Sequence, residues 1–261
     1  MSWRLRRQLF IVFILCLFFG SLVGLYYYFN VRVPISCTDG IKNQGEIDVD
    51  CGGPCVKICA SEVKDLSVEW VRPFKISDGK YDVAAMMVNR NNLFGISKFN
   101  YRFTLFDDKN VHVAEKTGTI FINPNEKVLI TESGLDTGKR VVSRAFLEYS
   151  EDRLEQGWVR TEETSDKPKL LVGNEKVTAG PNPKISAEIT NDSPYDISNI
   201  NVAIAVYDKD GNAIAVSSTY LDRINKGTTE NIVFTWPEAF SSEWKSYDIL
   251  PRADYTLSGN N

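Results

Sequence analysis

Residues 98–106 read Lys-Phe-Asn-Tyr-Arg-Phe-Thr-Leu-Phe, with an apolar side chain at every second position. Successive side chains of a strand point to opposite faces of its sheet, so these apolar residues share one face. They are Phe99, Tyr101, Phe103 and Leu105. The alternation predicts a β-strand with one buried face, as in an antiparallel sheet that is covered on one side.

A second strand with the same pattern follows at an offset of 101 residues, which takes Phe99 to Ile200. The next inward-facing positions of this strand are Val202, Ile204 and Val206. The same offset superimposes Ile96-Ser97 on Ile197-Ser198, Phe106-Asp107 on Tyr207-Asp208, and Ala114 on Ala215. In both copies the aspartate opens a turn, where its side chain accepts backbone N–H bonds. A constant offset over several elements indicates an internal duplication.

Each copy has the size of an immunoglobulin-like β-sandwich, which takes about 100 residues. We therefore expect a mostly β protein with two tandem immunoglobulin-like antiparallel β-sandwiches, at residues 62–160 and 169–255. A polar linker at 161–168 is expected to join them, and a polar tail follows at 256–261. Two sandwiches arranged in line would suit a spacer or a docking arm.

The amino-terminal segment predicts the location. Residues 9–29 carry no charge, and a helix of this length, at about 1.5 Å per residue, matches the hydrocarbon core of a bilayer. Because Arg4, Arg6 and Arg7 precede it, the positive-inside rule places residues 1–8 in the cytoplasm and the remainder outside. We expect an uncleaved, single-pass transmembrane helix. The alternative is a cleaved signal peptide, whose apolar region typically spans about 7–15 residues.

Four of the five cysteines are clustered beyond this segment, at Cys37, Cys51, Cys55 and Cys59. An even number of clustered cysteines outside the cytoplasm predicts two disulfides in a small module at residues 35–60. The sequence leaves the pairing open. A zinc site is the alternative, although the spacing lacks the C-x2-C pairs that zinc sites usually have. Cys16 lies within the apolar segment, where it is expected to act as a small apolar residue.

The loop between the first two clustered cysteines is rich in oxygen-bearing side chains, namely Asp39, Asn43, Glu46, Asp48 and Asp50. Calcium takes about six to eight oxygen ligands, often from a flexible loop. These five residues are therefore candidate calcium ligands, although their spacing is not that of an EF-hand. The alternative is a polar loop, rich in turns, whose carboxylates are solvated. The sequence favours neither interpretation.

Two short motifs resemble known families. The string C-x-D-G-I-x-N-x-x-E-x-D-V-D-C-G-G-x-C, from Cys37 to Cys55, resembles a cysteine-rich motif of bacterial and eukaryotic secreted or surface-anchored proteins. Phe103-Thr-Leu-Phe-Asp107 is similar to the signature of FxLYD-type domains, with Phe in place of Tyr, and Ile204-Ala-Val-Tyr-Asp208 is a looser copy. These resemblances imply immunoglobulin-like domains of an anchored bacterial envelope protein, and neither implies an activity.

Composition favours a binding role over an enzymatic one. The net charge is −4, which disfavours a nucleic acid held through its phosphates. The one histidine, His112, lies in an alternating strand with no nucleophile nearby, so we expect no enzyme. The tryptophans that follow the anchor are expected to pack in cores, and they are Trp70, Trp158, Trp236 and Trp244.

We predict a membrane-anchored, extracytoplasmic binding or spacer protein of the cell envelope, whose partner is an envelope or surface protein. The first alternative is a carbohydrate- or peptidoglycan-binding module. The second is an accessory subunit of an envelope enzyme or transport complex. Calcium is the one cofactor that the sequence raises.

Overall fold

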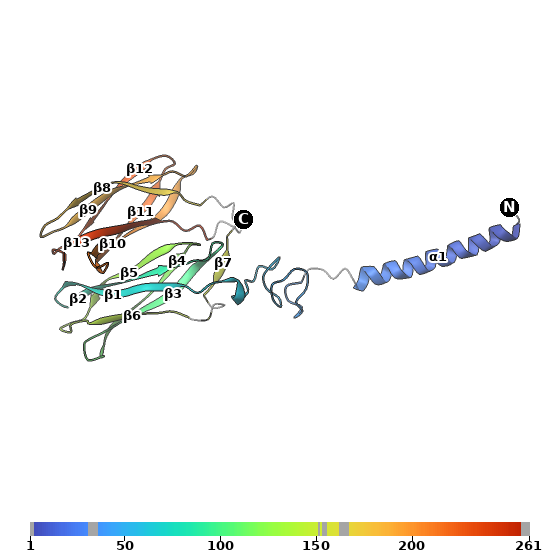
Figure 1. The fold of residues 1–261 in the computed structure, drawn as a ribbon, viewed down its shortest axis with the longest axis horizontal. Coiled ribbons are helices and arrows are strands. Elements are labelled where there is room, and N and C mark those ends of the chain that lie inside the picture. The colour runs from blue at the N-terminus through green and yellow to red at the C-terminus, as the bar shows by residue number, and fades with distance from the viewer. Residues whose placement is uncertain (1–2, 31–35, 151, 153–155, 162–166, 257–261) are drawn as a thin grey trace. The chain divides into compact units, whose positions relative to one another are not determined.

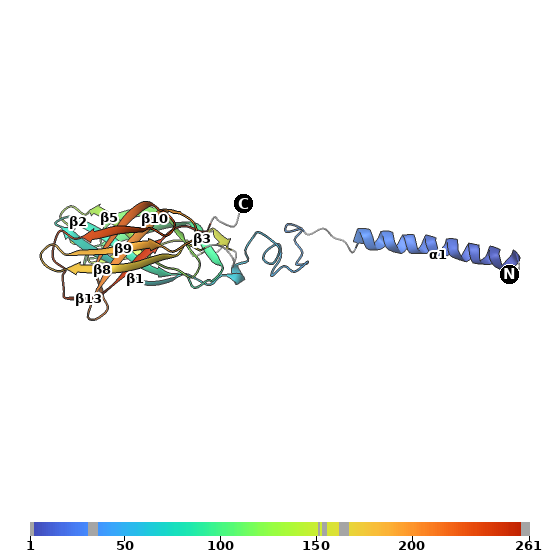
Figure 2. The same ribbon diagram turned by 90° about the horizontal axis from the view of Figure 1, so that it is seen from above.

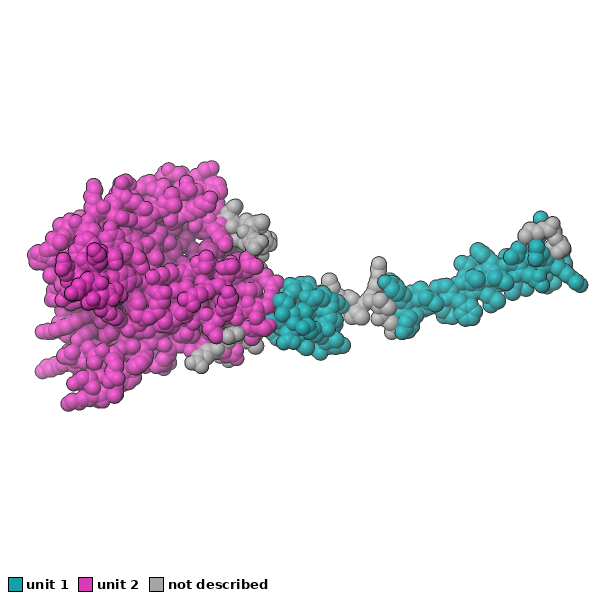
Figure 3. Space-filling view, in the orientation of Figure 1, with its two compact units in different colours: residues 1–59 teal, residues 60–261 magenta. Residues whose placement is uncertain are grey.

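The computed structural model describes residues 3–30, 36–150, 152, 156–161 and 167–256. The chain divides into two compact units, Met1–Cys59 and Ala60–Asn261, which Figure 3 colours separately. The predicted linker at 161–168 lies mostly outside the described residues, which include only its positions 161, 167 and 168. The predicted tail at 256–261 is described only at residue 256.

The first unit contains the long helix α1 (Trp3–Asn30). The predicted apolar span of 9–29 lies inside this helix. The helix begins earlier, at Trp3, and so includes the arginine-rich residues that precede the span. Its large apolar side chains are exposed. Among the described residues, α1 is the one helix long and apolar enough to cross a membrane. By length and composition it meets the requirements of a membrane anchor and also those of a signal sequence.

Residues 36–59 form the predicted cysteine-rich module. Two disulfides hold it, Cys37–Cys55 and Cys51–Cys59. Regular structure here is limited to turns and one isolated bridge between Asp48 and Cys51. So short a segment cannot build a hydrophobic core of its own, so the cross-links take over the role of a core.

The first sandwich of the second unit has two antiparallel sheets. One sheet has the order β1 (Ser67–Ser77), β2 (Lys80–Val88) and β5 (Lys127–Asp136). The other has β4 (His112–Ile122), β3 (Phe94–Phe106) and β6 (Arg144–Glu148), and β7 (Trp158–Arg160) also pairs with β3. The four inward-facing residues predicted for β3 are buried between these sheets. A short 3-10 helix, η1 (Ala60–Glu62), precedes β1.

The second sandwich repeats this order of strands. Its first sheet contains β8 (Leu170–Thr178), β9 (Lys184–Asn191) and β12 (Thr229–Thr235), with β9 in the centre. Its second sheet contains β11 (Ala213–Ile224), β10 (Ile197–Asp208) and β13 (Trp244–Arg252), with β10 in the centre. The central strands β3 and β10 carry the aligned motifs, so the predicted duplication is confirmed.

The turns after β3 and β10 show the duplication at the level of single atoms. The side chain of Asp107 accepts hydrogen bonds from the backbone N–H groups two and four residues further on, and Asp208 does the same. Asn110 and Gly211, at the same offset, both have a positive φ, of 61° and 78°. These residue types adopt such a conformation at little cost, which explains why they occupy the equivalent positions.

The two sandwiches are packed side by side through a third hydrophobic core. The β1-β2-β5 sheet contributes Phe74, Ala84, Met86 and Leu129, and the β11-β10-β13 sheet contributes Ala203, Ala205, Ala213 and Val216. The four sheets of the second unit therefore follow one another as successive layers (Figures 1 and 2). The expected in-line arrangement is wrong, because an in-line pair would leave these apolar faces exposed to water.

The two sheets that pack against each other do not occupy equivalent positions in the two copies. The first sandwich uses the sheet centred on β2, and the second uses the sheet centred on β10. Both strands contain unbroken apolar runs, Val-Ala-Ala-Met-Met at 83–87 and Val-Ala-Ile-Ala-Val at 202–206. Such runs indicate a strand that is buried on both faces, and every residue of the two runs is buried.

A buried ion pair reinforces this packing. The guanidinium group of Arg252, at the end of β13, donates hydrogen bonds of 3.0 and 2.9 Å to the carboxylate of Glu126. It also donates to the carbonyl of Phe121 and lies 4.0 Å from the centre of that ring. The following residues continue the contact, since the Tyr255 hydroxyl donates to the carbonyl of Pro124 at 3.0 Å. Burial and the nearby Glu126 raise the pKa of Tyr255 to about 12.

The substitution Met86→Ala is expected to lower the free energy of unfolding by about 2–5 kcal/mol, because it leaves a cavity in the core between the sandwiches. Chemical denaturation of the full chain measures this loss. Thr178→Ala, at an exposed position of β8, is the control, with an expected change within about 0.5 kcal/mol. Equal effects of the two substitutions would show that the third core contributes nothing to stability.

Arg252→Met is expected to cost about 3–5 kcal/mol, because it leaves the Glu126 carboxylate buried without its cation. Adding Glu126→Gln removes that charge and should recover part of the loss. A double-mutant cycle, again followed by chemical denaturation, gives the coupling between the two side chains. Strictly additive effects would mean that the ion pair is not formed.

The turn aspartates provide a pH test. The backbone N–H of Val111 is the main cause that lowers the pKa of Asp107, and the N–H of Asn212 lowers that of Asp208. A carboxyl group whose pKa is lower in the folded state stabilises the fold above its unfolded pKa, and this stabilisation is lost as the pH falls through the folded pKa. Carbon NMR of the carboxyl groups should therefore give midpoints below 3.8 for both. Midpoints at or above that value would contradict the hydrogen-bonded turns.

Candidate functional site

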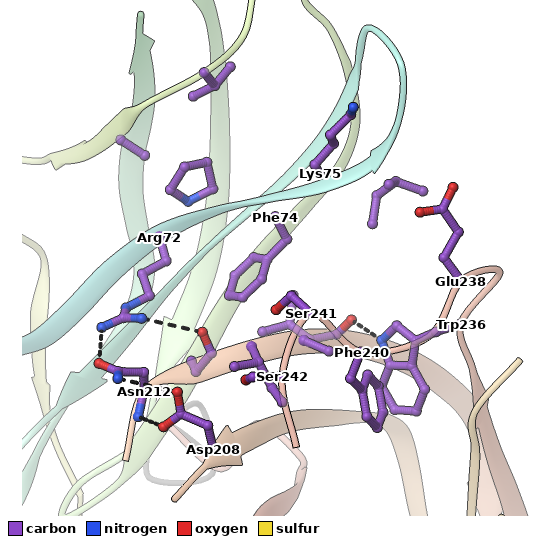
Figure 4. A pocket seen from close by; sticks show the side chains of 18 of the residues that line it. Arg72, Phe74, Lys75, Asp208, Asn212, Trp236, Glu238, Phe240, Ser241 and Ser242 are labelled. Carbon is purple, nitrogen blue, oxygen red and sulfur yellow. Dashed lines mark hydrogen bonds between the residues drawn. The ribbon is translucent and has the colours of Figure 1, made fainter. Parts of the chain in front are cut away.

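A cleft of about 970 Å³ lies between the two sandwiches of the second unit (Figure 4). Four segments line it: residues 71–76 of β1, 142–146 at the start of β6, 212–216 at the start of β11, and 236–242 after β12. Since both sandwiches contribute, the cleft depends on the side-by-side packing.

Three of these segments belong to edge strands. Among the strands of the described residues, β1 pairs with β2 alone, β6 with β3 alone, and β11 with β10 alone. An edge strand has unpaired N–H and C=O groups along one side, where an added strand can bind. Because consecutive residues of each strand line the cleft, it is bordered by main chain as well as by side chains. Pro73, within β1, lacks an N–H, and proline in a sheet is typical of edge strands.

One wall of the cleft is fixed by a polar network. The guanidinium group of Arg72 donates a 2.7 Å hydrogen bond to the side-chain oxygen of Asn212, which Figure 4 shows as a dashed line. The backbone N–H of Asn212 donates in turn to the Asp208 carboxylate at 2.8 Å. Arg72 comes from the first sandwich and the other two residues from the second, so this network also joins the sandwiches.

Aromatic side chains form much of the remaining wall. The indole N–H of Trp236 donates to the carbonyl of Val216 at 2.9 Å, and the Phe240 ring lies edge-on to the indole at 5.1 Å. In Figure 4 Phe74 projects from β1 toward the same space. Phe146 is half exposed at the rim. Trp236 is thereby held as a rigid wall, while Phe240 and Phe146 stay accessible to a bound molecule.

The charged groups at the rim have both signs. Lys75 and Arg144 are basic, and Glu238 is acidic. The Lys75 ammonium donates to Asp78 at 2.6 Å, and this bond raises the pKa of Lys75. The rim of the cleft thus carries both signs of charge beside a wall that is rich in aromatic side chains.

The predicted disulfide residues come together in the structure, which selects one of the three possible pairings. The candidate calcium ligands are placed differently. Asp50 accepts hydrogen bonds from the backbone N–H groups of Asp39 and Gly40, while Asp39 accepts from Ile41 and from the Asn43 side chain. Their oxygens thus stabilise turns of the loop.

The other two predicted ligands have similar roles. Asp48 accepts from the N–H of Val49, and Glu46 accepts from the N–H of Asn43. Within the described residues, the one group of potential metal ligands lying within 4.8 Å of one another joins Glu46 to Cys37 and Cys55, whose sulfurs form a disulfide. Calcium binding by the loop stays a prediction.

The histidine and three of the four tryptophans singled out in the sequence lie away from the cleft. His112 is exposed, with Nε2 3.7 Å from the Glu115 carboxylate. Trp158, Trp244 and Trp70 each pack against one of the three hydrophobic cores. The exception is Trp236, which is buried and lines the cleft.

No protein-family model matches the chain, and no curated protein matches it. Solved structures with a partial likeness include a red sea bream transglutaminase, at 10% identity over 72% of this chain and 29% of that chain, with a TM-score of 0.25. A Bacteroides uniformis β-glucuronidase matches at 10% identity over 66% and 24%, with a TM-score of 0.22. The chain thus spans less than a third of the length of either enzyme.

A tandem CBM22 domain of Paenibacillus barcinonensis Xyn10C matches at 9% identity over 75% of this chain and 87% of that chain, with a TM-score of 0.16. Likenesses at this level carry no argument about function.

Proposed function

We propose that the chain is a membrane-anchored, extracytoplasmic binding protein of the cell envelope, without enzymatic activity of its own. The apolar helix α1 and the arginines at its amino-terminal end support the anchor and its orientation. The paired cysteines support an oxidising space for the remainder of the chain. The resemblance to FxLYD-type domains and to the cysteine-rich surface motif agrees with this location.

The cleft between the sandwiches is the proposed binding site, and it is the single observation that carries the proposal. It combines unpaired strand edges, accessible rings of Phe146 and Phe240, and a rim with both signs of charge. An extended segment of a partner protein matches these features, because its main chain can pair with a strand edge while its side chains occupy the aromatic wall.

The carbohydrate-binding alternative has less support. A sugar site usually needs an exposed aromatic platform, and the four tryptophans outside α1 pack against hydrophobic cores instead. A role as accessory subunit of an envelope enzyme or transport complex is compatible with the same cleft, since only the identity of the partner differs.

The test replaces Phe240 by a photo-crosslinking phenylalanine analogue in cells that make the full chain. Irradiation should give a covalent adduct to a protein, detected as a mass shift. The same analogue at Thr178, an exposed position on β8, should give none. Adding Ser242→Trp, which fills the cleft from an exposed lining position, should abolish the Phe240 adduct.

Two results would contradict this proposal. Equal adducts at positions 240 and 178 would mean that the cleft is not a selective site. An adduct that consists of glycan and no protein would replace protein docking by the carbohydrate-binding alternative.

A further inference from the structure

The three edge strands that line the cleft are not equally free to accept an added strand. In β1, Pro73 lies in the middle of the lining residues, and a proline in an edge strand offers its ring to the open side in place of an N–H. In β11, the Val216 carbonyl accepts the indole N–H of Trp236 at 2.9 Å, and the Ala213 carbonyl lies 3.5 Å from the Arg72 guanidinium group. Both strands therefore have part of their open edge blocked or already bonded.

The register of β3 shows which main-chain groups point toward β6. The Asp107 N–H bonds to the Val111 carbonyl, on the side of β4, whereas the Phe106 carbonyl accepts the N–H of Ser143, on the side of β6. In an antiparallel sheet the main-chain groups of successive residues point to opposite sides of the strand. Phe106 and Thr104 therefore direct their N–H and C=O groups toward β6.

The open edge of β6 follows from this register. The β6 partners of Phe106 and Thr104 are Arg144 and Phe146, which therefore direct their main-chain groups toward β3. Ala145, between them, directs its N–H and C=O groups away from β3, and it lines the cleft. Within the described residues, these groups of Ala145 take part in no turn, loop or side-chain hydrogen bond. Of the three edges, β6 is thus the one that can pair with a new strand at the cleft.

The side chains at this edge indicate what the added strand carries. A residue paired with Ala145 would place its side chain on the same face, toward the core of the first sandwich, which favours an apolar residue. The next residue would lie on the outer face, beside the exposed side chains of Arg144 and Phe146. Among the described residues Arg144 has no ion pair, whereas Lys75 at the rim is already paired. An acidic residue opposite Arg144 supplies the missing charge.

We propose that the cleft binds an extended segment of a partner protein as a further strand of the β4-β3-β6 sheet, beside β6. The segment alternates apolar residues with at least one acidic residue, and it has no proline at its paired positions. In this mode of recognition the main chain supplies affinity and the alternate side chains supply specificity. The inference rests on the proposed binding role of the cleft, and it specifies the pairing edge and the chemistry of the partner.

The experiment measures the yield of the photo-crosslinked adduct at position 240 in cells that make the full chain. Ala145→Pro removes the N–H that points away from β3 and leaves the ladder between β3 and β6 intact. We expect the yield to fall about tenfold, which is within the range for the loss of one hydrogen bond. The matched control is Thr117→Pro, at an exposed position on the opposite edge of the same sheet. Its N–H also points away from β3, and the yield should not change.

Arg144→Glu tests the charge without altering the main chain. It should lower the yield about fivefold, because an exposed ion pair is lost and a repulsion takes its place. This variant decides the matter if Ala145→Pro fails to fold, which a much lower thermal unfolding midpoint than that of Thr117→Pro would reveal. The crosslinked peptide is then sequenced, and it should contain alternating apolar residues and an aspartate or glutamate.

The outcomes separate this inference from the proposed function. No adduct at position 240 in the unsubstituted chain overturns the binding site, and the inference with it. A protein adduct whose yield is the same in Ala145→Pro and in Arg144→Glu as in the unsubstituted chain keeps the site and overturns the pairing at β6. An adduct to a second copy of this chain likewise keeps the site and overturns the acidic partner.

Discussion

The burial of two sheets on both of their faces is the constraint on which the second unit depends. A β-sandwich needs one apolar face on each sheet, and the opposite face normally meets water. Here the sheet centred on β2 and the sheet centred on β10 are apolar on both sides, so either sandwich alone would expose one apolar face of that sheet to water. The third core, the buried Arg252–Glu126 pair and the Arg72–Asn212 contact all follow from that arrangement.

The alternating stretch at 98–106 and its copy predicted the strands and the duplication correctly, because a two-residue period reports directly on a half-buried strand. The in-line arrangement was wrong for a physical reason that the sequence contains. Residues 83–87 and 202–206 do not alternate, and unbroken apolar runs indicate two buried faces. The alternation within β3 reports on a sheet that is buried on one face, whereas the equivalent strand β10 is buried on both faces.

The cleft could not be predicted from local patterns. Its lining comes from four segments that span residues 71–242, and they meet only after the sandwiches pack. Trp236 is buried, as the sequence predicts, and it also forms the cleft wall with Phe240. The disulfide residues were predictable from their number and setting. The pairing depends on how turns such as Asp39–Ile41 are held by Asp50, which no spacing rule gives.

Packing between non-equivalent sheets is in principle open-ended, because each repeat presents one face of either kind and further copies could be added at both ends. The side chains on the two outer faces prevent this. The positions of Ala203 and Ala205 are taken in β3 by Arg102 and Thr104. In the sheet centred on β9, the positions equivalent to Ala84, Met86 and Leu129 hold Ser186, Glu188 and Asn231. The strand pairing gives this equivalence, since Met86 pairs with Leu129 as Glu188 pairs with Asn231. Such polar side chains make both outer faces poorly suited to burial against a further apolar sheet, as the polar outer faces of terminal repeats do in repeat proteins.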